Sequence, residues 1–359
     1  MINHKNRLVF LFPVLLLLLS CSSRPQTNHI GNTSGTSNPS PIASKKEIDP
    51  ILSAKIETEI DRNYPNLYSI LIQQGGTIVY EKYYRGHTAD TYTHVFSVTK
   101  SVMSALVGIA LDKGKIQSLD QPIADYLPEY FPDPDKYNKK EITIRHALTM
   151  TSGQTPTDQT LNRWMSSPDW FAYTIDQPKD FPAGQKFSYN TGLTHLLSGV
   201  ITRASGMSTK DFADRYLFGP LGITNYRWET DPKGYYGGGH LLYLTPRDMA
   251  KFGQLYLQKG MWNDVQVVPQ AWVDESIRSQ VKVDDITSYG YLWWVYSTYD
   301  SKNKKALPTF AAHGMGNQHI IVIPERDLVV TITCDPDRLS KNRTDPAVLV
   351  EKFILPALP

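Results

Sequence analysis

The sequence predicts an α+β fold, in which an antiparallel sheet built from N- and C-terminal strands carries a large helical insertion. Two apolar runs near the start of the chain, "LYSILIQQ" and "TIVYEKYYRG", flank Gly75-Gly76. They predict a hairpin, because glycine enters a positive-φ turn without penalty. Further strand-like runs, among them "QHIIVIP" and "DLVVTITC", lie near the C-terminus. The segment between, from Ser97 to about residue 286, carries mostly helical signals.

The composition is that of a globular protein with a full core. The chain has 359 residues, of which 41% are hydrophobic and 20% are charged. Its 37 basic and 35 acidic residues give a net charge of +2, and basic residues occur only in short pairs, so nucleic acid is not an expected partner. No His, Cys or Glu spacing predicts a metal site, and no Gly-rich loop follows a strand as a phosphate site requires. We therefore expect no cofactor, and the oligomeric state stays open.

The first residues predict export. Residues 1–20 combine Lys5 and Arg7 with an apolar stretch at 8–19, which is short for a membrane span of about 20 residues. The stretch ends in "LLSC", which resembles the lipobox of bacterial lipoproteins, so Cys21 is the expected lipidation site. The alternative is an ordinary secretory signal with an incidental cysteine. We expect a lipoprotein anchored to the cell membrane, on its periplasmic or extracellular face.

A tether and one domain follow the signal peptide. Residues 21–46 are rich in Ser, Thr, Asn, Pro and Gly without apolar periodicity, which predicts a disordered tether. Residues 47–359 form the expected domain, with a helical subdomain at about 120–285. Cys21 and Cys334 are the only cysteines, so lipidation of Cys21 would exclude an intramolecular disulfide.

The stretch "FSVTKS" carries the first chemical signal. Ser97 and Lys100 lie three residues apart, which places both on one face at the start of a helix. The residues that follow are apolar on nearly every side, so the helix should cross the core. A buried amine loses solvation, its pKa falls, and the neutral amine can accept the proton of the serine hydroxyl. The alternative is a plain N-cap serine followed by a surface lysine.

Several segments in order resemble the serine β-lactamase and penicillin-binding-protein superfamily. Besides "FSVTKS", they include "ITIRHALTMTSG", "PAGQKFSYNTGLTHLLSGVITRASG", "YGYLWWV" and "AAHGMGNQHIIVIPERDLVVTIT". Their order is that of the class C-like branch, which includes esterases, D-aminopeptidases and 6-aminohexanoate-dimer hydrolases, and the resemblance covers roughly residues 50 to 355. It implies a β-lactamase/DD-peptidase-like fold.

The resemblance also implies roles for single residues. Ser97 matches the acyl-accepting nucleophile, Lys100 its partner base, and Tyr189 the second-motif tyrosine that relays a proton. The family pattern Tyr-x-Asn is replaced by Tyr189-Asn190-Thr191, so either Asn190 or Thr191 fills the polar position. Without the flanking match, Tyr189 would be one of 21 tyrosines, packing at a helix start.

The third motif of the family matches "HGMGNQ". Its glycines would let a substrate carbonyl approach the strand, where a backbone amide of Met315 or Gly316 would join that of Ser97 in an oxyanion hole. His313 either orients the substrate or the tyrosine, or is a strand histidine with satisfied hydrogen bonds.

Four more residues have two interpretations. His240, in "YYGGGHLLYLTP", is a candidate pocket residue, but a Gly-rich loop with a histidine is often only a turn, so we leave it out of the catalytic set. Trp164, Trp170 and Phe171 line a substrate wall or, as aromatic residues more often do, pack in the core.

Together these observations predict an exported serine hydrolase that cleaves an ester or amide bond through an acyl-enzyme on Ser97. The substrate would be a small-molecule ester, amide or peptide. The first alternative is a D,D-carboxypeptidase or β-lactamase acting on cell-wall peptides or lactams. The second is a non-catalytic lipoprotein that keeps the fold as a binding module.

Overall fold

The computed structural model of the protein describes residues 49–358, except 132–134, 136–137, 339 and 341–343. The signal peptide, the lipidation site at Cys21 and the tether predicted above lie outside the described residues. Within the described part, no helix has both the length and the apolar composition needed to span a bilayer.

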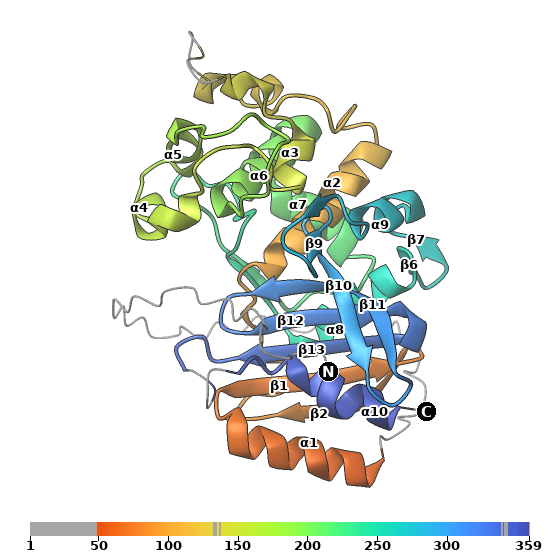
Figure 1. Ribbon diagram of the computed structural model, residues 1–359. Helices are drawn as coiled ribbons and strands as arrows, with labels where there is room; N and C mark the ends of the chain where they lie inside the picture. Colours follow the sequence, from red (N-terminus) through yellow and green to blue (C-terminus); the bar gives the residue numbers. More distant parts are fainter. Residues whose placement is uncertain (1–48, 132–134, 136–137, 339, 341–343, 359) are drawn as a thin grey trace, which may run out of the picture.

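A large antiparallel sheet forms the lower half of the molecule in Figure 1. Strands from the two ends of the chain meet in it, because β1 pairs with β13, with Ile70 opposite Ile332. The α+β prediction is therefore confirmed. Among the described residues the sheet has eight strands, in the order β2 (Thr77–Tyr83), β1 (Leu67–Gln74), β13 (Leu328–Cys334), β12 (Gln318–Ile323), β11 (Lys305–Gly314), β10 (Trp294–Asp300), β9 (Ser288–Tyr289) and β8 (Val281–Lys282).

The predicted hairpin at Gly75-Gly76 is present. Both glycines adopt left-handed backbone conformations, with φ of +57° and +72°, as the turn between β1 and β2 requires.

Helices cover both faces of the sheet (Figure 1). On one face, α1 and the C-terminal helical segment pack on a cluster that includes Ile56, Ile72 and Ile332. On the other face, α2 and α8 separate the sheet from the remaining helices. The described α-helices are α1 (Pro50–Asn63), α2 (Val98–Asp112), α3 (Ile144–Leu148), α4 (Leu161–Met165), α5 (Trp170–Asp176), α6 (Thr191–Ser205), α7 (Thr209–Ala213), α8 (Pro246–Leu257), α9 (Gln270–Ser276) and α10 (Leu355–Ala357).

Helix α2 runs through the core, as its sequence predicts. Every residue from Val98 to Ala110 is buried, so the helix has no solvent-exposed face over this stretch. It contacts α6, α9 and β11. A Cβ at Gly108 would lie 2.3 Å from the Trp272 ring, so this glycine permits α9 to pack directly on α2.

A small second sheet joins the start of α2 to a distant loop. Its strands lie in the order β3 (Thr93–His94), β5 (Leu242–Leu244) and β4 (Arg227–Trp228). The Gly237–Gly239 loop directly precedes β5 and is thereby brought beside the segment that enters α2. Two further short strands, β6 (Met261–Trp262) and β7 (Val265–Gln266), form a hairpin, so the middle of the chain holds short strands as well as helices.

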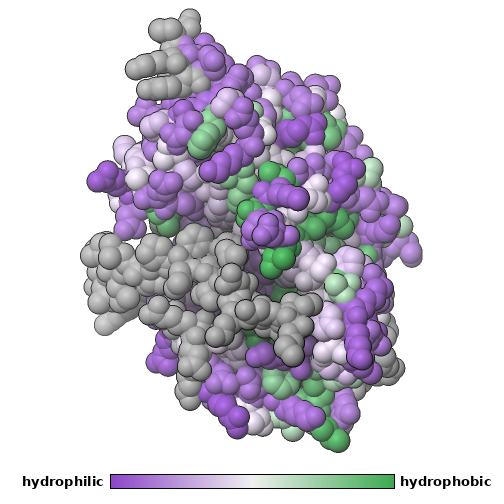
Figure 2. All heavy atoms as spheres, viewed as in Figure 1, coloured by the Kyte–Doolittle hydropathy of each residue, from purple (hydrophilic) through white to green (hydrophobic). Residues whose placement is uncertain are grey.

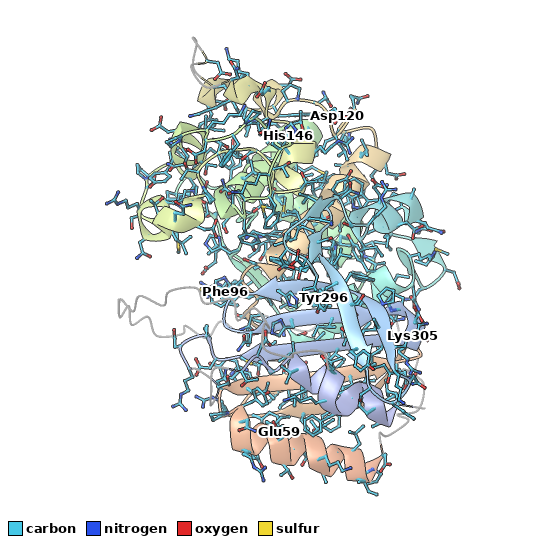
Figure 3. All side chains as sticks on the ribbon, in the orientation of Figure 1. Glu59, Phe96, Asp120, His146, Tyr296 and Lys305 are labelled. Carbon is cyan, nitrogen blue, oxygen red and sulfur yellow. The ribbon has the colours of Figure 1, made fainter. Side chains whose placement is uncertain are left out.

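Hydrophilic residues cover most of the face drawn in Figure 2. Hydrophobic residues gather near its middle, between the helical part and the sheet. The start of α2 lies at the same boundary, where Figure 3 places Phe96.

Candidate active site

Ser97 occupies the N-cap position of α2 but does not use its side chain as a cap. It is half-buried, and its hydroxyl oxygen accepts a hydrogen bond from Lys100 Nζ at 3.0 Å. The preceding residue, Phe96, has a φ of +47°, a left-handed conformation that is unfavourable for an aromatic residue. The sharp backbone turn at Phe96 leads directly into the helix, and it leaves the Ser97 hydroxyl free of the helix end.

Lys100 is buried at the base of the site. The residue is only 1% exposed, so the alternative interpretation of Lys100 as a surface lysine is wrong. Besides Ser97, Nζ donates to Thr191 Oγ1 at 3.1 Å and to the Gly239 carbonyl at 2.8 Å. Three oxygen atoms thus surround the amine, which fixes its position relative to Ser97.

Burial changes the protonation of this amine. It lowers the pKa of Lys100 to about 8, with the Asp158 carboxylate acting in the opposite direction. A neutral amine keeps two hydrogens, which Thr191 and Gly239 can accept, and its lone pair then faces the Ser97 hydroxyl. The geometry therefore suits proton transfer from Ser97 to Lys100.

Tyr189 lies next to Lys100. The amine is 4.9 Å from the centre of the Tyr189 ring, and Trp294 stacks on that ring at a centroid distance of 6.0 Å. Burial raises the pKa of the Tyr189 hydroxyl, Asp158 raises it further, and a hydrogen bond with Ser97 opposes the rise. The hydroxyl is consequently protonated near neutral pH and can donate.

Asn190 and Thr191, the two candidates for the polar position of the second motif, make different contacts. Asn190 is the N-cap of α6, and its amide oxygen accepts from the backbone N–H of Leu193 and from the hydroxyl of Thr157. Thr191, the next residue, contacts Lys100 directly. The structure therefore puts Thr191, and not Asn190, beside the amine; Asn190 shapes the start of the helix that carries Thr191.

Asp158 is a part of the site that sequence reasoning missed. It lies on the 3₁₀ turn Thr157–Thr160 and accepts from the Thr191 N–H at 2.6 Å and the Thr191 hydroxyl at 2.7 Å. Because the Thr191 hydroxyl donates to Asp158, its lone pair is left to accept from Lys100. Nothing in "TPTDQT" distinguishes this aspartate from other acidic residues, and only the folded chain brings it to α6.

Replacing Asp158 by asparagine should move the pH dependence of the site. The carboxylate raises the pKa of Lys100, so Asp158→Asn is expected to shift the acidic limb of kcat/KM to lower pH. We also expect activity to fall about tenfold, because the two Thr191 donors bond to different carboxylate oxygens and the amide nitrogen, itself a donor, would replace one of them. Asp120→Asn is the control, since Asp120 lies at the far end of the helical part (Figure 3). If the acidic limb of kcat/KM does not move in Asp158→Asn, Asp158 does not influence the pKa of Lys100 as proposed.

The third-motif segment approaches the start of α2 closely. Strand β11 ends at Gly314, where a Cβ would lie 2.2 Å from the Val95 carbonyl oxygen, so only glycine permits this contact. Met315 follows and is 47% exposed, and Gly316 has a φ of +73°. Both candidates for the second oxyanion donor therefore lie in the turn after β11, next to the glycine that contacts the segment entering α2.

His313 is engaged with another histidine. Its Nδ1 lies 2.7 Å from His319 Nδ1, and its ring stacks on Tyr296 at 6.0 Å. Burial and the neighbouring His319 lower the pKa of His313 to about 3. A neutral histidine bonded within the sheet agrees with the interpretation of a satisfied strand histidine.

His240 and the three aromatic residues form one buried cluster. The Trp170 ring stacks on His240 at 5.4 Å, and burial lowers the pKa of His240 well below its usual value, with the Lys100 charge adding to the effect. Trp164, Trp170 and Phe171 are at most 4% exposed, which agrees with core packing. Within the described residues, no group of three or more His, Cys, Asp or Glu side chains could hold a metal ion.

A serine hydroxyl next to a buried lysine, at the start of a core helix packed on an antiparallel sheet, defines the class of serine hydrolases with a β-lactamase fold. The chain belongs to the Beta-lactamase family, whose model matches residues 56–350. The family predicted from the motifs is therefore confirmed.

Individual relatives agree with this assignment. The chain is 22% identical over 296 residues to the 6-aminohexanoate-dimer hydrolase of Paenarthrobacter ureafaciens, an alignment that covers 75% of this chain and 73% of that protein. The fold of this chain resembles that of an octameric penicillin-binding protein homologue from Pyrococcus abyssi. The TM-score is 0.65 and the identity 19%, and the match covers 84% of this chain and 76% of that chain. It also resembles a class C beta-lactamase, with a TM-score of 0.64, 17% identity and coverage of 86% and 95%.

Proposed function

We propose that this protein hydrolyses an ester or amide bond through an acyl-enzyme on Ser97. Lys100 accepts the proton of the Ser97 hydroxyl, and the oxygen attacks the substrate carbonyl carbon. Backbone N–H groups of Ser97 and of Met315 or Gly316 stabilise the oxyanion. When the carbonyl re-forms, the bond to the leaving group breaks, and Tyr189 delivers its proton to that group while taking up the proton that Lys100 received from Ser97. Water then attacks the acyl carbon and gives a proton to Lys100, the bond to Ser97 Oγ breaks, and this oxygen regains its proton from Lys100.

One observation carries this proposal: the amine of Lys100 is buried and held within hydrogen-bond distance of a serine hydroxyl that caps nothing. Burying a lysine is unfavourable unless its charge is suppressed or paired. Its closest oxygen neighbours are two hydroxyls and a carbonyl rather than a carboxylate. This environment favours the neutral, proton-accepting form.

A serine-reactive fluorophosphonate tests the proposal. We expect the purified protein lacking residues 1–46 to be labelled stoichiometrically, and Ser97→Ala to be unlabelled although folded. Labelling that persists unchanged in Ser97→Ala would overturn the assignment. The same protein should turn over p-nitrophenyl acetate or a linear 6-aminohexanoate dimer, the second chosen because of the relative named above. Turnover of nitrocefin alone would favour the β-lactamase or D,D-carboxypeptidase alternative, and no turnover beyond one equivalent would favour a binding module.

The pH dependence follows from the state of Lys100. The proton-accepting form predominates above a pKa of about 8 and is lost as the pH falls through that value. We therefore expect kcat/KM to rise about tenfold per pH unit up to about pH 8 and then to level off. The pKa of Tyr189 is raised, so its hydroxyl stays protonated across this range. Measurement of kcat/KM from about pH 5.5 to 9.5 checks this; a flat profile down to pH 6 would contradict it.

We also propose that the protein is exported and held at a membrane through lipid on Cys21. The support is the charged and apolar segment 1–20 followed by "LLSC". Metabolic labelling with a palmitate analogue should modify the full chain but not Cys21→Ser. Labelling of both would contradict the site, and labelling of neither would contradict the lipoprotein proposal.

A further inference from the structure

A buried histidine and aspartate lie behind the loop that contacts Lys100. His195 is on α6 and is fully buried, and Asp231, which follows β4, is 4% exposed. Their side chains meet at 2.9 Å, between His195 Nε2 and Asp231 Oδ2. Neither residue contacts Ser97 or Lys100 among the hydrogen bonds of the described residues, so the mechanism above does not use them.

The hydrogen bonds of Asp231 fix the tautomer of His195. Asp231 Oδ1 accepts from the backbone N–H groups of Lys233 and Tyr235, both at 2.9 Å, and Oδ2 faces His195. The carboxylate requires a donor, so His195 carries its proton on Nε2. Nδ1 is then an acceptor, and the Gly238 N–H donates to it at 3.2 Å.

The same loop supplies the carbonyl that binds Lys100. A Cβ at Gly238 would lie 2.5 Å from the Thr194 carbonyl oxygen, and one at Gly239 would lie 2.6 Å from the Thr191 carbonyl oxygen. The loop is thus in direct backbone contact with α6, which only glycine allows. From this position the Gly239 carbonyl accepts from Lys100 Nζ.

We propose that Asp231 and His195 are positioning residues for the catalytic lysine. Asp231 keeps His195 Nδ1 free to accept from the Gly238 N–H, and this hydrogen bond holds the Gly239 carbonyl in place. The carbonyl accepts one hydrogen of the Lys100 amine, so that the lone pair of the amine faces Ser97. The inference rests on the function proposed above, because it assigns Lys100 as the base. The proposed function alone requires no particular tautomer of His195, whereas this inference requires the tautomer protonated on Nε2.

The surroundings of His195 keep this arrangement static. The rings of Trp164, Trp170 and Phe171 lie 4.8 to 6.0 Å from its ring and cover it. The charged and titratable groups that face it are Asp231, Asp169 and His240. Burial lowers the pKa of His195, against the effect of Asp231, so the ring remains neutral near neutral pH. It therefore acts by orientation and does not transfer protons.

Asp231→Asn tests the tautomer. The amide oxygen can still accept from the backbone of Lys233 and Tyr235, but the amide nitrogen would donate to His195 Nε2. His195 would then carry its proton on Nδ1, facing the Gly238 N–H, and the loop would have to move. We expect the second-order rate of fluorophosphonate labelling at Ser97 to fall about tenfold. Loss of the Gly239 acceptor also destabilises the ammonium form of Lys100, so the acidic limb of the labelling rate should move to lower pH.

Two substitutions of His195 separate positioning from simple packing. Asparagine places an amide oxygen where Nδ1 lies and so keeps an acceptor for Gly238, whereas glutamine places its amide group near Nε2 and keeps the contact with Asp231. If the tautomer matters through the loop, His195→Asn is labelled about tenfold faster than His195→Gln. If the pair only stabilises the fold, His195→Gln is at least as active as His195→Asn, which overturns the proposal.

The failure of this inference is distinguishable from the failure of the proposed function. If the unsubstituted protein is not labelled at Ser97, the function itself is wrong, and the inference falls with it. If it is labelled, but Asp231→Asn and Asp120→Asn both show the same labelling rate and the same pH dependence of that rate, only the positioning proposal is overturned. Circular dichroism and thermal unfolding identify folded variants. Should Asp231→Asn fail to fold, the comparison of the two His195 variants decides alone.

Discussion

Replacing Lys100 by alanine is expected to lower kcat/KM about a thousandfold, because it removes the group that accepts the proton of Ser97. The oxygen atoms that accepted from the amine, those of Thr191 and of the Gly239 carbonyl, are poor bases and do not replace it. Fluorophosphonate labelling of Ser97 should slow in parallel, since it needs the same activation. Steady-state kinetics with p-nitrophenyl acetate and the labelling rate measure both effects.

Lys139 provides a matched control for Lys100. It is also a buried lysine, 7% exposed, and it donates to the carbonyl oxygen of Ile175, away from Ser97. We expect Lys139→Ala to lower thermal stability and to leave kcat/KM within about threefold of the unsubstituted protein. If Lys100→Ala loses no more activity than Lys139→Ala, another group removes the proton, and the assignment of Lys100 as base is wrong.

The sheet and the nucleophile helix were predictable because their signals are local. The glycine pair between two apolar runs fixes the β1–β2 hairpin, and a continuous apolar segment after Ser97 fixes a helix buried on all sides. Burial of that helix in turn predicts a buried Lys100. The strand-like runs at both ends of the chain predict a shared sheet, but the pairing of β1 with β13 joins segments at opposite ends of the chain, and no local signal specifies that these two strands are neighbours.

The residues around Lys100 were not predictable in the same way. The Gly239 carbonyl accepts from the amine, and Asp158 accepts from the Thr191 hydroxyl beside it. Both arrangements depend on contacts between segments far apart in sequence. The choice between Asn190 and Thr191 depends on where α6 begins, and a shift of one residue changes which side chain faces Lys100. A backbone carbonyl, moreover, has no side-chain identity that a sequence motif could record.

The two ionisable groups beside Ser97 are shifted in opposite directions by one cause. Burial disfavours the charged form of each, so the pKa of Lys100 falls and that of Tyr189 rises. Around pH 8 the lysine can accept a proton while the tyrosine still holds one. Such a pair supplies a base and an acid at the same pH. This division of labour assigns proton removal from Ser97 to Lys100 and proton delivery to the leaving group to Tyr189.

The effect of Tyr189→Phe should consequently depend on the leaving group. An amide nitrogen must be protonated as it leaves, so we expect kcat for an amide substrate to fall about 10²- to 10³-fold when the phenol is removed. A p-nitrophenolate leaves without a proton, so kcat for the p-nitrophenyl ester should fall less than about tenfold. Measuring both substrates with the same enzyme preparation gives the ratio directly, independent of the active fraction.

Tyr256→Phe is the control for this comparison, because Tyr256 is a buried tyrosine on α8 whose ring packs against Phe252 and Trp293 in the core. It should change neither rate. An equal loss on both substrates in Tyr189→Phe would mean that the tyrosine acts before the leaving group departs, either by positioning Ser97 or by sharing its proton with Lys100. The role of proton donor would then pass to Lys100. Its ammonium form is generated when Ser97 attacks the substrate, and its Nζ lies 3.0 Å from Ser97 Oγ.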